Sequence, residues 1–152
     1  METKKTLVLG TDEQSLTRAA DIVRQGGTVV FPTETVYGLG ANALDPLACK
    51  KIFEAKGRPM DNPLIVHVPA VFDIGRCAEL SPEGADLAHT FMPGPLTLIL
   101  PKKPPIPPEV TAGLPTVGLR VPASPAARDF LQKAGVPVAA PSANLSGRPS
   151  PT

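Results

Sequence analysis

The chain has 152 residues, of which 42% are hydrophobic and 19% charged, and its formal net charge is +1. A chain of this size buries about 70% of its unfolded surface on folding, so we expect one domain and exclude disorder, a coiled coil and a two-domain arrangement. The longest apolar runs fall far short of the roughly 18 residues that a membrane span needs, and no signal-peptide core follows the first residues. We therefore expect a cytoplasmic protein without a membrane segment.

The content of cysteine, histidine and aromatic residues narrows the function further. Cys49 and Cys77 lie far apart without a Cys-x-x-Cys pattern, and only His67 and His89 could join them at a metal, so we predict neither a disulfide scaffold nor a metal site. With no tryptophan, one tyrosine and five phenylalanines, the chain offers few faces for stacking bases, and a charge of +1 gives no general attraction for phosphate. A dedicated nucleic-acid binder is disfavoured.

The N-terminal third predicts a strand, a helix and a second strand. Residues 6–9 form a short apolar run. Thr11 with Gln14 three positions later fits a capping box, and the helix that follows should end at Gly26 and Gly27. Its apolar stripe, at i, i+3, i+4 and i+7, consists of Leu16, Ala19, Ala20 and Val23. Residues 28–31 then predict a buried strand.

Three further helices share one signature, an N-cap side chain followed by proline at the first helical position. The signature occurs at Asp45-Pro46, Ser81-Pro82 and Ser124-Pro125, and the helices should run to about Lys56, Phe91 and Ala134. Strands are predicted at residues 64–68, 96–100, 117–121 and 136–140, with a shorter helix at 70–77. This alternation predicts an α/β fold, and the sheet should be mixed because no helix separates the 96–100 and 117–121 strands. The proline-rich segment 101–113 could cover a site.

A glycine-rich segment at residues 38–43 matches a dinucleotide-binding fingerprint, with Asp61 at a suitable distance. Its context differs from the fingerprint's, because the next helix begins several residues later and Asp61 precedes a strand instead of ending one. We interpret the segment as a structural turn. A P-loop motif is absent from the sequence, which excludes a P-loop ATPase.

Lys56 and Arg58 flank Gly57 at the end of the helix that begins at Asp45-Pro46. They could be solvated cations that offset the helix dipole, as we expect for Lys50 and Lys51. Alternatively, Gly57 lets both project from a loop toward one anion, with arginine offering a fork for phosphate oxygens. The spacing alone favours neither interpretation over the other.

Polar residues inside or after strands form a second group of candidates. Residues 141–152 follow the last strand, where α/β sheets often bind ligands, although such residues are also ordinary in loops. His67 and Arg120 lie inside apolar strands, so each needs a partner or a ligand. A histidine there is usually a satisfied core residue, whereas the arginine more often marks an anion. We expect His89 to be structural.

Five motifs occur in one order along the chain. They are Phe-Pro-Thr-Glu-Thr-Val-Tyr-Gly-Leu at 31–39, Lys-Gly-Arg-Pro with Asn-Pro-Leu at 56–64, Pro-Gly-Pro-Leu-Thr at 93–97, Gly-Leu-Arg-Val-Pro at 118–122 and Pro-Ser-Ala-Asn-Leu-Ser-Gly at 141–147. Over roughly residues 10–152 this set resembles the YrdC-like threonylcarbamoyl-adenylate synthases. The resemblance implies a twisted mixed sheet flanked by helices around a basic cavity, YrdC-like or dihydroxybutanone phosphate synthase-like. It also implies that L-threonine, bicarbonate and ATP are joined into threonylcarbamoyl-adenylate and pyrophosphate, for modification of the tRNA adenosine beside the anticodon.

The resemblance also assigns residues to two sides of one site. Lys56 and Arg58 are implied to be catalytic and ATP-binding residues, which favours the anion-binding interpretation over that of solvated cations. Further ATP contacts are implied at Asn62, Thr116, Ser142, Asn144 and Ser150. Threonine contacts are implied at Thr35, His67, Arg120 and the backbone of Ala140. Fixed cations would screen the repulsion between two anionic reactants, with Mg²⁺ as an expected partner. We see no covalent nucleophile and expect direct adenylyl transfer.

The family pattern continues beyond the Ser-Pro-Thr run, whereas this chain stops at Thr152. We therefore expect a single domain over residues 1–152 that lacks the family's C-terminal portion. Such a domain should bind its ligands weakly and turn over slowly or not at all. It should also either dimerise through a sheet edge or be mobile from about Ser142. The expected partner is the tRNA-threonylcarbamoyl transferase machinery. Two alternatives are a carbamoyl-adenylate-forming module of the hydrogenase maturation type and a module that contacts tRNA or double-stranded RNA.

Overall fold

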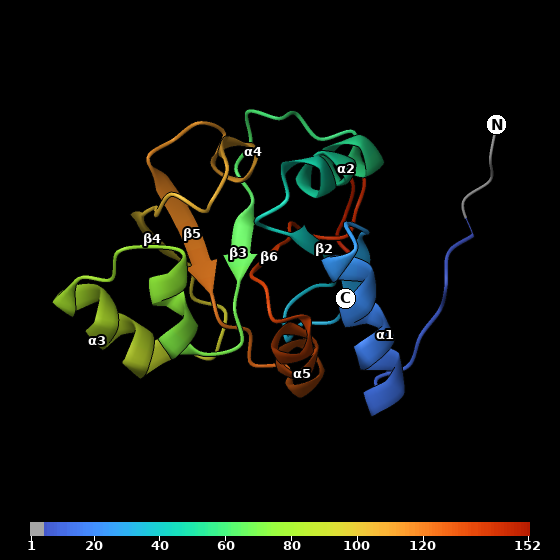
Figure 1. The fold of residues 1–152 in the computed structure, drawn as a ribbon, viewed down its shortest axis with the longest axis horizontal. Coiled ribbons are helices and arrows are strands. Elements are labelled where there is room, and N and C mark those ends of the chain that lie inside the picture. The colour runs from blue at the N-terminus through green and yellow to red at the C-terminus, as the bar shows by residue number, and fades with distance from the viewer. Residues whose placement is uncertain (1–4) are drawn as a thin grey trace.

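The computed structural model describes residues 5–152, which form a six-stranded mixed sheet with helices packed against it (Figure 1). The strands are β1 (Val29–Phe31), β2 (Gly38–Asn42), β3 (Ile65–His67), β4 (Leu98–Pro101), β5 (Thr116–Arg120) and β6 (Val138–Ala139). Their order across the sheet is β1-β2-β6-β3-β5-β4. Only β3 and β5 pair in parallel, and the other neighbours are antiparallel. The predicted α/β class and mixed sheet are confirmed.

The three helices with the proline signature begin where the sequence predicts. α2 (Pro46–Lys56), α3 (Pro82–Phe91) and α5 (Pro125–Ala134) each follow a capping side chain that accepts backbone N–H bonds in the first turn. The caps are Asp45, Ser81 and Ser124. Gly57 and Gly135 end α2 and α5 in the left-handed conformation, which costs glycine little. The predicted short helix is a 3₁₀ segment, η1 (Val71–Arg76).

The N-terminal predictions need three corrections. Residues 6–9 form no strand, and Val8 is 95% exposed, because β-propensity cannot hold a strand without a neighbour to pair with. Asp12, not Thr11, caps α1 (Glu13–Arg24), since its carboxylate accepts the Ser15 N–H at 3.2 Å. β1 lies at the edge of the sheet instead of being fully buried, with Val30 exposed.

The segment interpreted as a turn at residues 38–43 is mostly strand β2, so that interpretation is wrong. The glycines serve packing. A Cβ atom at Gly40 would lie 2.8 Å from Phe31 Cε1 and 2.7 Å from Val138 Cγ1. Glycine in a strand often marks such a close approach, and here it lets the Phe31 ring lie across β2 toward the centre of the sheet.

Two apolar clusters form the core, one on each face of the sheet. Val138 and Ala139 are consecutive in β6 and belong to different clusters, as alternation along a strand requires. α1 and α5 pack together over Phe31 and Val138. The other cluster joins α2 to β3 and β5 through residues such as Ile52, Val66 and Leu119.

The segment 101–113 contributes to the core as well. It contains a short helix, α4 (Pro108–Thr111), and buries Ile106 and Val110 completely. These two side chains belong to the core that contains α2 and β3, so this part of the segment packs the fold instead of covering a site. Within residues 5–152, none of the helices combines the length and the apolar content needed to cross a membrane.

Candidate functional site

Lys56 ends α2, and its side chain is buried, with the residue only 4% exposed. Its ammonium group donates to the backbone oxygens of Ser142 and Asn144, each at 2.5 Å, and lies 3.5 Å from Asn144 Oδ1. The Lys56 carbonyl in turn accepts the Ser146 N–H at 2.9 Å. An ammonium group has three donors, so this one is satisfied by oxygens of a single loop.

Asn144 is the centre of the same loop. Ser142 Oγ donates to Asn144 Oδ1, and Ser150 Oγ donates to the same oxygen at 3.2 Å. The Asn144 amide nitrogen donates to the carbonyls of Leu145 and Arg148 at 2.9 and 2.8 Å. Three residues predicted on the ATP side therefore converge, together with Lys56.

Arg58 follows Lys56 by two residues and is half-buried. Its Nη2 donates to the Pro63 carbonyl at 2.8 Å and its Nε to the Asn62 carbonyl at 3.4 Å. A guanidinium has five N–H donors, so, as far as residues 5–152 are concerned, three of them remain for an anion. Thr116 begins β5, and none of its hydrogen bonds within residues 5–152 joins it to the Lys56 loop.

The expectation that Lys56 and Arg58 both sit on a loop is wrong for Lys56. The lysine belongs to the helix and is buried because its partners come from a segment distant in sequence. Burial lowers the pKa of the Lys56 ammonium, and the charge of Arg58 lowers it further. Burial also lowers the pKa of Arg58, although arginine stays charged in proteins. Two neighbouring, partly desolvated cations are an arrangement that favours a bound anion.

Arg120 forms a second polar cluster at the end of β5. Its Nε donates to the Gly94 carbonyl at 3.1 Å and its Nη1 to Thr35 Oγ1 at 3.2 Å. Its Nη2 pairs with Glu34 Oε1 at 2.5 Å, and Glu34 Oε2 accepts the Ala123 N–H at 2.8 Å. The prediction of Arg120 and Thr35 as neighbours is consistent with this geometry, but Glu34 was missed. Its position beside Thr35 in the first motif was the available signal.

His67 stands next to Arg120 in the parallel register of β3 and β5. Its Nδ1 lies 3.1 Å from the Ile65 carbonyl, and its ring meets Phe31 edge-on with centroids 5.9 Å apart. Burial, reinforced by the charge of Arg120, lowers the pKa of His67 to about 4, so the ring is neutral at pH 7. Ala140 is also buried, and its N–H donates to the Ile65 carbonyl at 2.9 Å.

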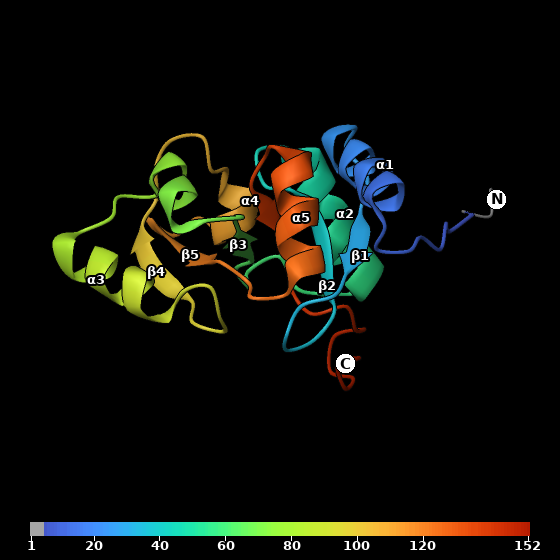
Figure 2. The ribbon, with the colours of Figure 1, turned by 90° about the horizontal axis from the view of Figure 1, so that it is seen from below.

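The two clusters adjoin through the chain that leaves β6. Ala140 belongs to the Arg120 side and Ser142 to the Lys56 side, while Gly38 and Ser142 form an isolated bridge. The Tyr37 carbonyl accepts the Ala143 N–H at 2.8 Å, and the Tyr37 N–H donates to the Pro151 carbonyl at 3.0 Å. Figure 2 shows the β1–β2 connection and the C-terminal segment side by side, on the side of the sheet away from α1.

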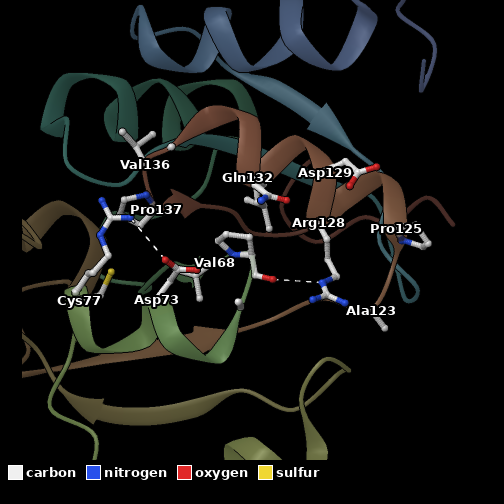
Figure 3. A pocket seen from close by; sticks show the side chains of 15 residues that line it. Val68, Asp73, Cys77, Ala123, Pro125, Arg128, Asp129, Gln132, Val136 and Pro137 are labelled. Atoms are coloured by element: carbon white, nitrogen blue, oxygen red, sulfur yellow. Dashed lines mark hydrogen bonds and ion pairs between the residues drawn. The ribbon is translucent and has the colours of Figure 1, made fainter. Parts of the chain in front are cut away.

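A cavity of about 530 Å³ lies elsewhere, between η1 and α5. Figure 3 shows Asp73 and Cys77 on the η1 side of it and Arg128 and Gln132 on α5. No predicted site residue lines this cavity. A smaller hollow of about 260 Å³ lies against Arg58 and Phe53. The candidate site is therefore identified by its hydrogen bonds and charges, not by the larger cavity.

The side chains also bear on metal binding and on cysteine as a nucleophile. Among residues 5–152, no group of three or more histidine, cysteine, aspartate or glutamate side chains is placed to hold a metal ion. Burial raises the pKa of Cys49 to about 12 and that of Cys77 to about 11. Both thiols are protonated at neutral pH, and a protonated thiol is a poor nucleophile.

Comparisons with known proteins place the chain in a family and show structures with a similar fold. The family model Sua5/YciO/YrdC, described as "Telomere recombination", matches residues 21–152. The threonylcarbamoyl-AMP synthase of Pyrococcus abyssi is 54% identical over 142 residues, covering 93% of this chain and 42% of the relative. That of Bacillus subtilis is 53% identical, covering 100% of this chain and 46% of the relative. The crystal structure of P. abyssi Sua5 complexed with L-threonine is 54% identical with a TM-score of 0.89, covering 93% of this chain and 42% of that one. The chain thus spans less than half the length of these relatives.

Replacing Lys56 should destabilise the fold and release the loop it holds. In Lys56→Ala, the carbonyls of Ser142 and Asn144 lose a charged donor, and we expect the free energy of unfolding to fall by about 2 kcal/mol. Urea denaturation measures this loss, and hydrogen exchange at the Ser146 amide should quicken. Lys50→Ala, on an exposed position of the same helix, is the control. Equal stability of the two variants would show that Lys56 does not anchor the loop.

The two histidines should differ in their effect on acid stability. Folding holds His67 neutral down to about pH 4, whereas in the unfolded chain it binds a proton near pH 6.5. The stability from neutral His67 is therefore complete above about pH 6.5 and is lost as the pH falls toward 4, by up to about 3 kcal/mol. Arg120 and Glu34 are the charged groups that act on the pKa of His67.

Urea denaturation at pH 7 and pH 4 tests this. His67→Gln should lose that part of the pH dependence, while His89→Gln, on the exposed surface of α3, should keep it. An identical pH dependence in the wild type and His67→Gln would mean that His67 is not held neutral.

Proposed function

Because this chain belongs to the Sua5/YciO/YrdC family, we propose that it catalyses the formation of threonylcarbamoyl-adenylate and pyrophosphate from L-threonine, bicarbonate and ATP. The observation that carries the proposal is the junction of two clusters, the Lys56 loop with Arg58 and the Arg120 group, through residues 140–142. One cluster has the charge for a triphosphate and the other the donors for an amino acid. The relatives named threonylcarbamoyl-AMP synthase support this choice.

On the nucleotide side, Lys56 shapes the loop and Arg58 supplies free N–H donors. The Lys56 ammonium donates its hydrogen bonds to loop oxygens, so its role at the phosphates is that of a nearby positive charge. Arg58 can offer paired donors to phosphate oxygens. Asn62, Ser142, Asn144 and Ser150 lie on the same segments, and we retain them and Thr116 as ATP contacts.

Mg²⁺ fits this side only as a companion of ATP. Residues 5–152 provide no cluster of carboxylates, histidines or cysteines that would make a protein cage for a metal ion. Mg²⁺ commonly binds substrate phosphates and water with few protein ligands, so we propose that it arrives with the nucleotide. The protein's own cations then act beside it on the triphosphate.

On the threonine side, Arg120 would receive the substrate carboxylate. Three of its five N–H groups are engaged by Gly94, Thr35 and Glu34, which leaves two for a ligand. Neutral His67 lies beside it, and Thr35 and the backbone at Ala140 complete the predicted contacts.

The reaction we propose has no covalent enzyme intermediate. The amine of L-threonine and bicarbonate form a carbamate with loss of water. A carbamate oxygen then attacks the α-phosphorus of ATP, the bond to the β-phosphate oxygen breaks, and pyrophosphate leaves. Lys56, Arg58 and Arg120 reduce the repulsion between the two anions and stabilise charge on the leaving group. Cys49 and Cys77 are buried and protonated, which agrees with direct transfer.

Two alternatives remain distinguishable. A carbamoyl-adenylate-forming module would use carbamoyl phosphate in place of threonine and bicarbonate. A module that binds tRNA or double-stranded RNA would need phosphate contacts, and the net charge of +1 offers no general attraction. We propose that the product passes to tRNA-threonylcarbamoyl transferase machinery, as expected for a tRNA-modifying system.

Pyrophosphate release tests the activity. The protein is incubated with ATP, Mg²⁺ and bicarbonate, with and without L-threonine, and we expect release only when threonine is present. Release without threonine would contradict the proposal, and release that depends on carbamoyl phosphate would favour the first alternative. RNA binding that falls steeply with salt, without pyrophosphate release, would favour the second.

Variants on the two sides should lose different ligands. Arg58→Ala should weaken binding of an ATP analogue by about thirtyfold, or about 2 kcal/mol, and spare threonine. Arg120→Ala should lose threonine and keep the ATP analogue. Isothermal titration with each ligand measures both. The division of the site is wrong if Arg58→Ala leaves the affinity for the analogue unchanged, or if Arg120→Ala loses the analogue instead of threonine.

A further inference from the structure

Glu34 sits at the threonine side of the site, and no predicted role accounts for it. We infer that Glu34 is a positioning residue that fixes Arg120 and Thr35 for the amino-acid substrate. The inference rests on the proposed function, since it concerns the same site. It assigns Glu34 no contact with the reacting atoms.

Both carboxylate oxygens of Glu34 are engaged. Oε1 pairs with Arg120 Nη2, and Oε2 accepts the Ala123 N–H at 2.8 Å. Ala123 follows β5, only three residues beyond Arg120, so the carboxylate bridges the arginine side chain and the backbone that leaves its own strand. The side chains of Arg120 and Glu34 are 11% and 25% exposed. An ion pair that is partly buried, with both carboxylate oxygens bonded, fixes a geometry that a fully solvated pair would not.

The guanidinium is held from three directions. Gly94 accepts from Nε, Thr35 from Nη1 and Glu34 from Nη2, and the three residues come from two loops distant in sequence. Two N–H groups remain, and their direction is set because the plane of the guanidinium is fixed. Loss of the Glu34 contact would leave the Nη2 end of the Arg120 guanidinium unfixed. A substrate carboxylate would then have to order the side chain as well as bind it.

The hydroxyl of Thr35, the neighbour of Glu34, is held by Thr33 and Arg120. Thr33 Oγ1 donates to the Val36 carbonyl at 2.5 Å, so Thr33 is the acceptor in its 3.1 Å contact with Thr35 Oγ1. Thr35 therefore donates to Thr33 and accepts from Arg120, which leaves its remaining lone pair for an N–H or O–H group of the ligand. Consecutive residues of one loop are thus bonded to the same guanidinium.

A different reading is that the Glu34 carboxylate occupies the place of the substrate carboxylate and competes with it. The Ala123 contact argues against this, because moving Glu34 aside would leave both a backbone N–H and an Arg120 nitrogen without their acceptor. Glu34 also balances the charge of Arg120 next to neutral His67. The two readings predict opposite changes in threonine affinity when the charge is removed.

Isothermal titration of Glu34→Gln tests the inference on the intact chain. L-threonine is titrated in the presence of a non-hydrolysable ATP analogue, and the analogue is titrated separately. We expect threonine to bind about tenfold or more weakly and the analogue to bind as in the wild type. Glu79→Gln, an exposed glutamate, is the matched control and should change neither affinity. A structural defect without a positioning role would weaken both ligands together.

Threonine affinity that is unchanged in Glu34→Gln would overturn the inference, and tighter binding would favour the competing reading instead. If the wild type itself binds no threonine, the proposed function has failed, which separates the two failures. Should Glu34→Gln fold poorly, Glu34→Asp keeps the charge but is one methylene shorter, and we expect it to weaken threonine binding with the analogue unaffected. In the absence of ligand, NMR should show that the Arg120 guanidinium group rotates faster in either variant than in the wild type. An unchanged rotation rate would also overturn the inference.

Discussion

A buried ammonium group is costly unless oxygen atoms surround it, and the arrangement of the candidate nucleotide side follows from this requirement at Lys56. The oxygens come from a loop 86 positions later in the chain. Meeting that need draws residues 142–146 against the end of α2 and sets the positions of Ser142 and Asn144. The loop then meets the backbone of Tyr37, which joins it to the segment that carries Glu34 and Thr35.

The two clusters differ in their charge balance, and the difference matches the two proposed ligands. Within residues 5–152, Lys56 and Arg58 bond only to carbonyl and amide oxygens, so no carboxylate of this part neutralises their positive charges. Arg120 is paired with Glu34, and His67 beside it is neutral. A highly anionic triphosphate suits the first environment, and a zwitterionic amino acid, which needs directed donors more than net charge, suits the second.

Local signals predicted the helices well, because capping depends on neighbouring residues such as Asp45 and Pro46. β2 was misread as a turn since its glycines are explained by Phe31 and Val138, which only the fold brings near. The motifs predicted site roles for Lys56 and Arg120, but they did not predict the burial of Lys56 or the ion pair of Arg120 with Glu34. Both depend on partners more than 80 positions away, which no local pattern contains.

The segment after β6 links the two sides energetically. Its long-range backbone bonds go to Ile65, β2, Tyr37 and Lys56, and the Lys56 ammonium adds two more, so these bonds must offset the entropy of ordering it. A nucleotide that contacts Ser142 and Asn144 would bind only the ordered loop and therefore stabilise it. Because the same loop is bonded to Tyr37, next to the segment that holds Arg120, order on one side favours the geometry needed on the other. Such coupling is reciprocal, so each ligand should raise the affinity for the other.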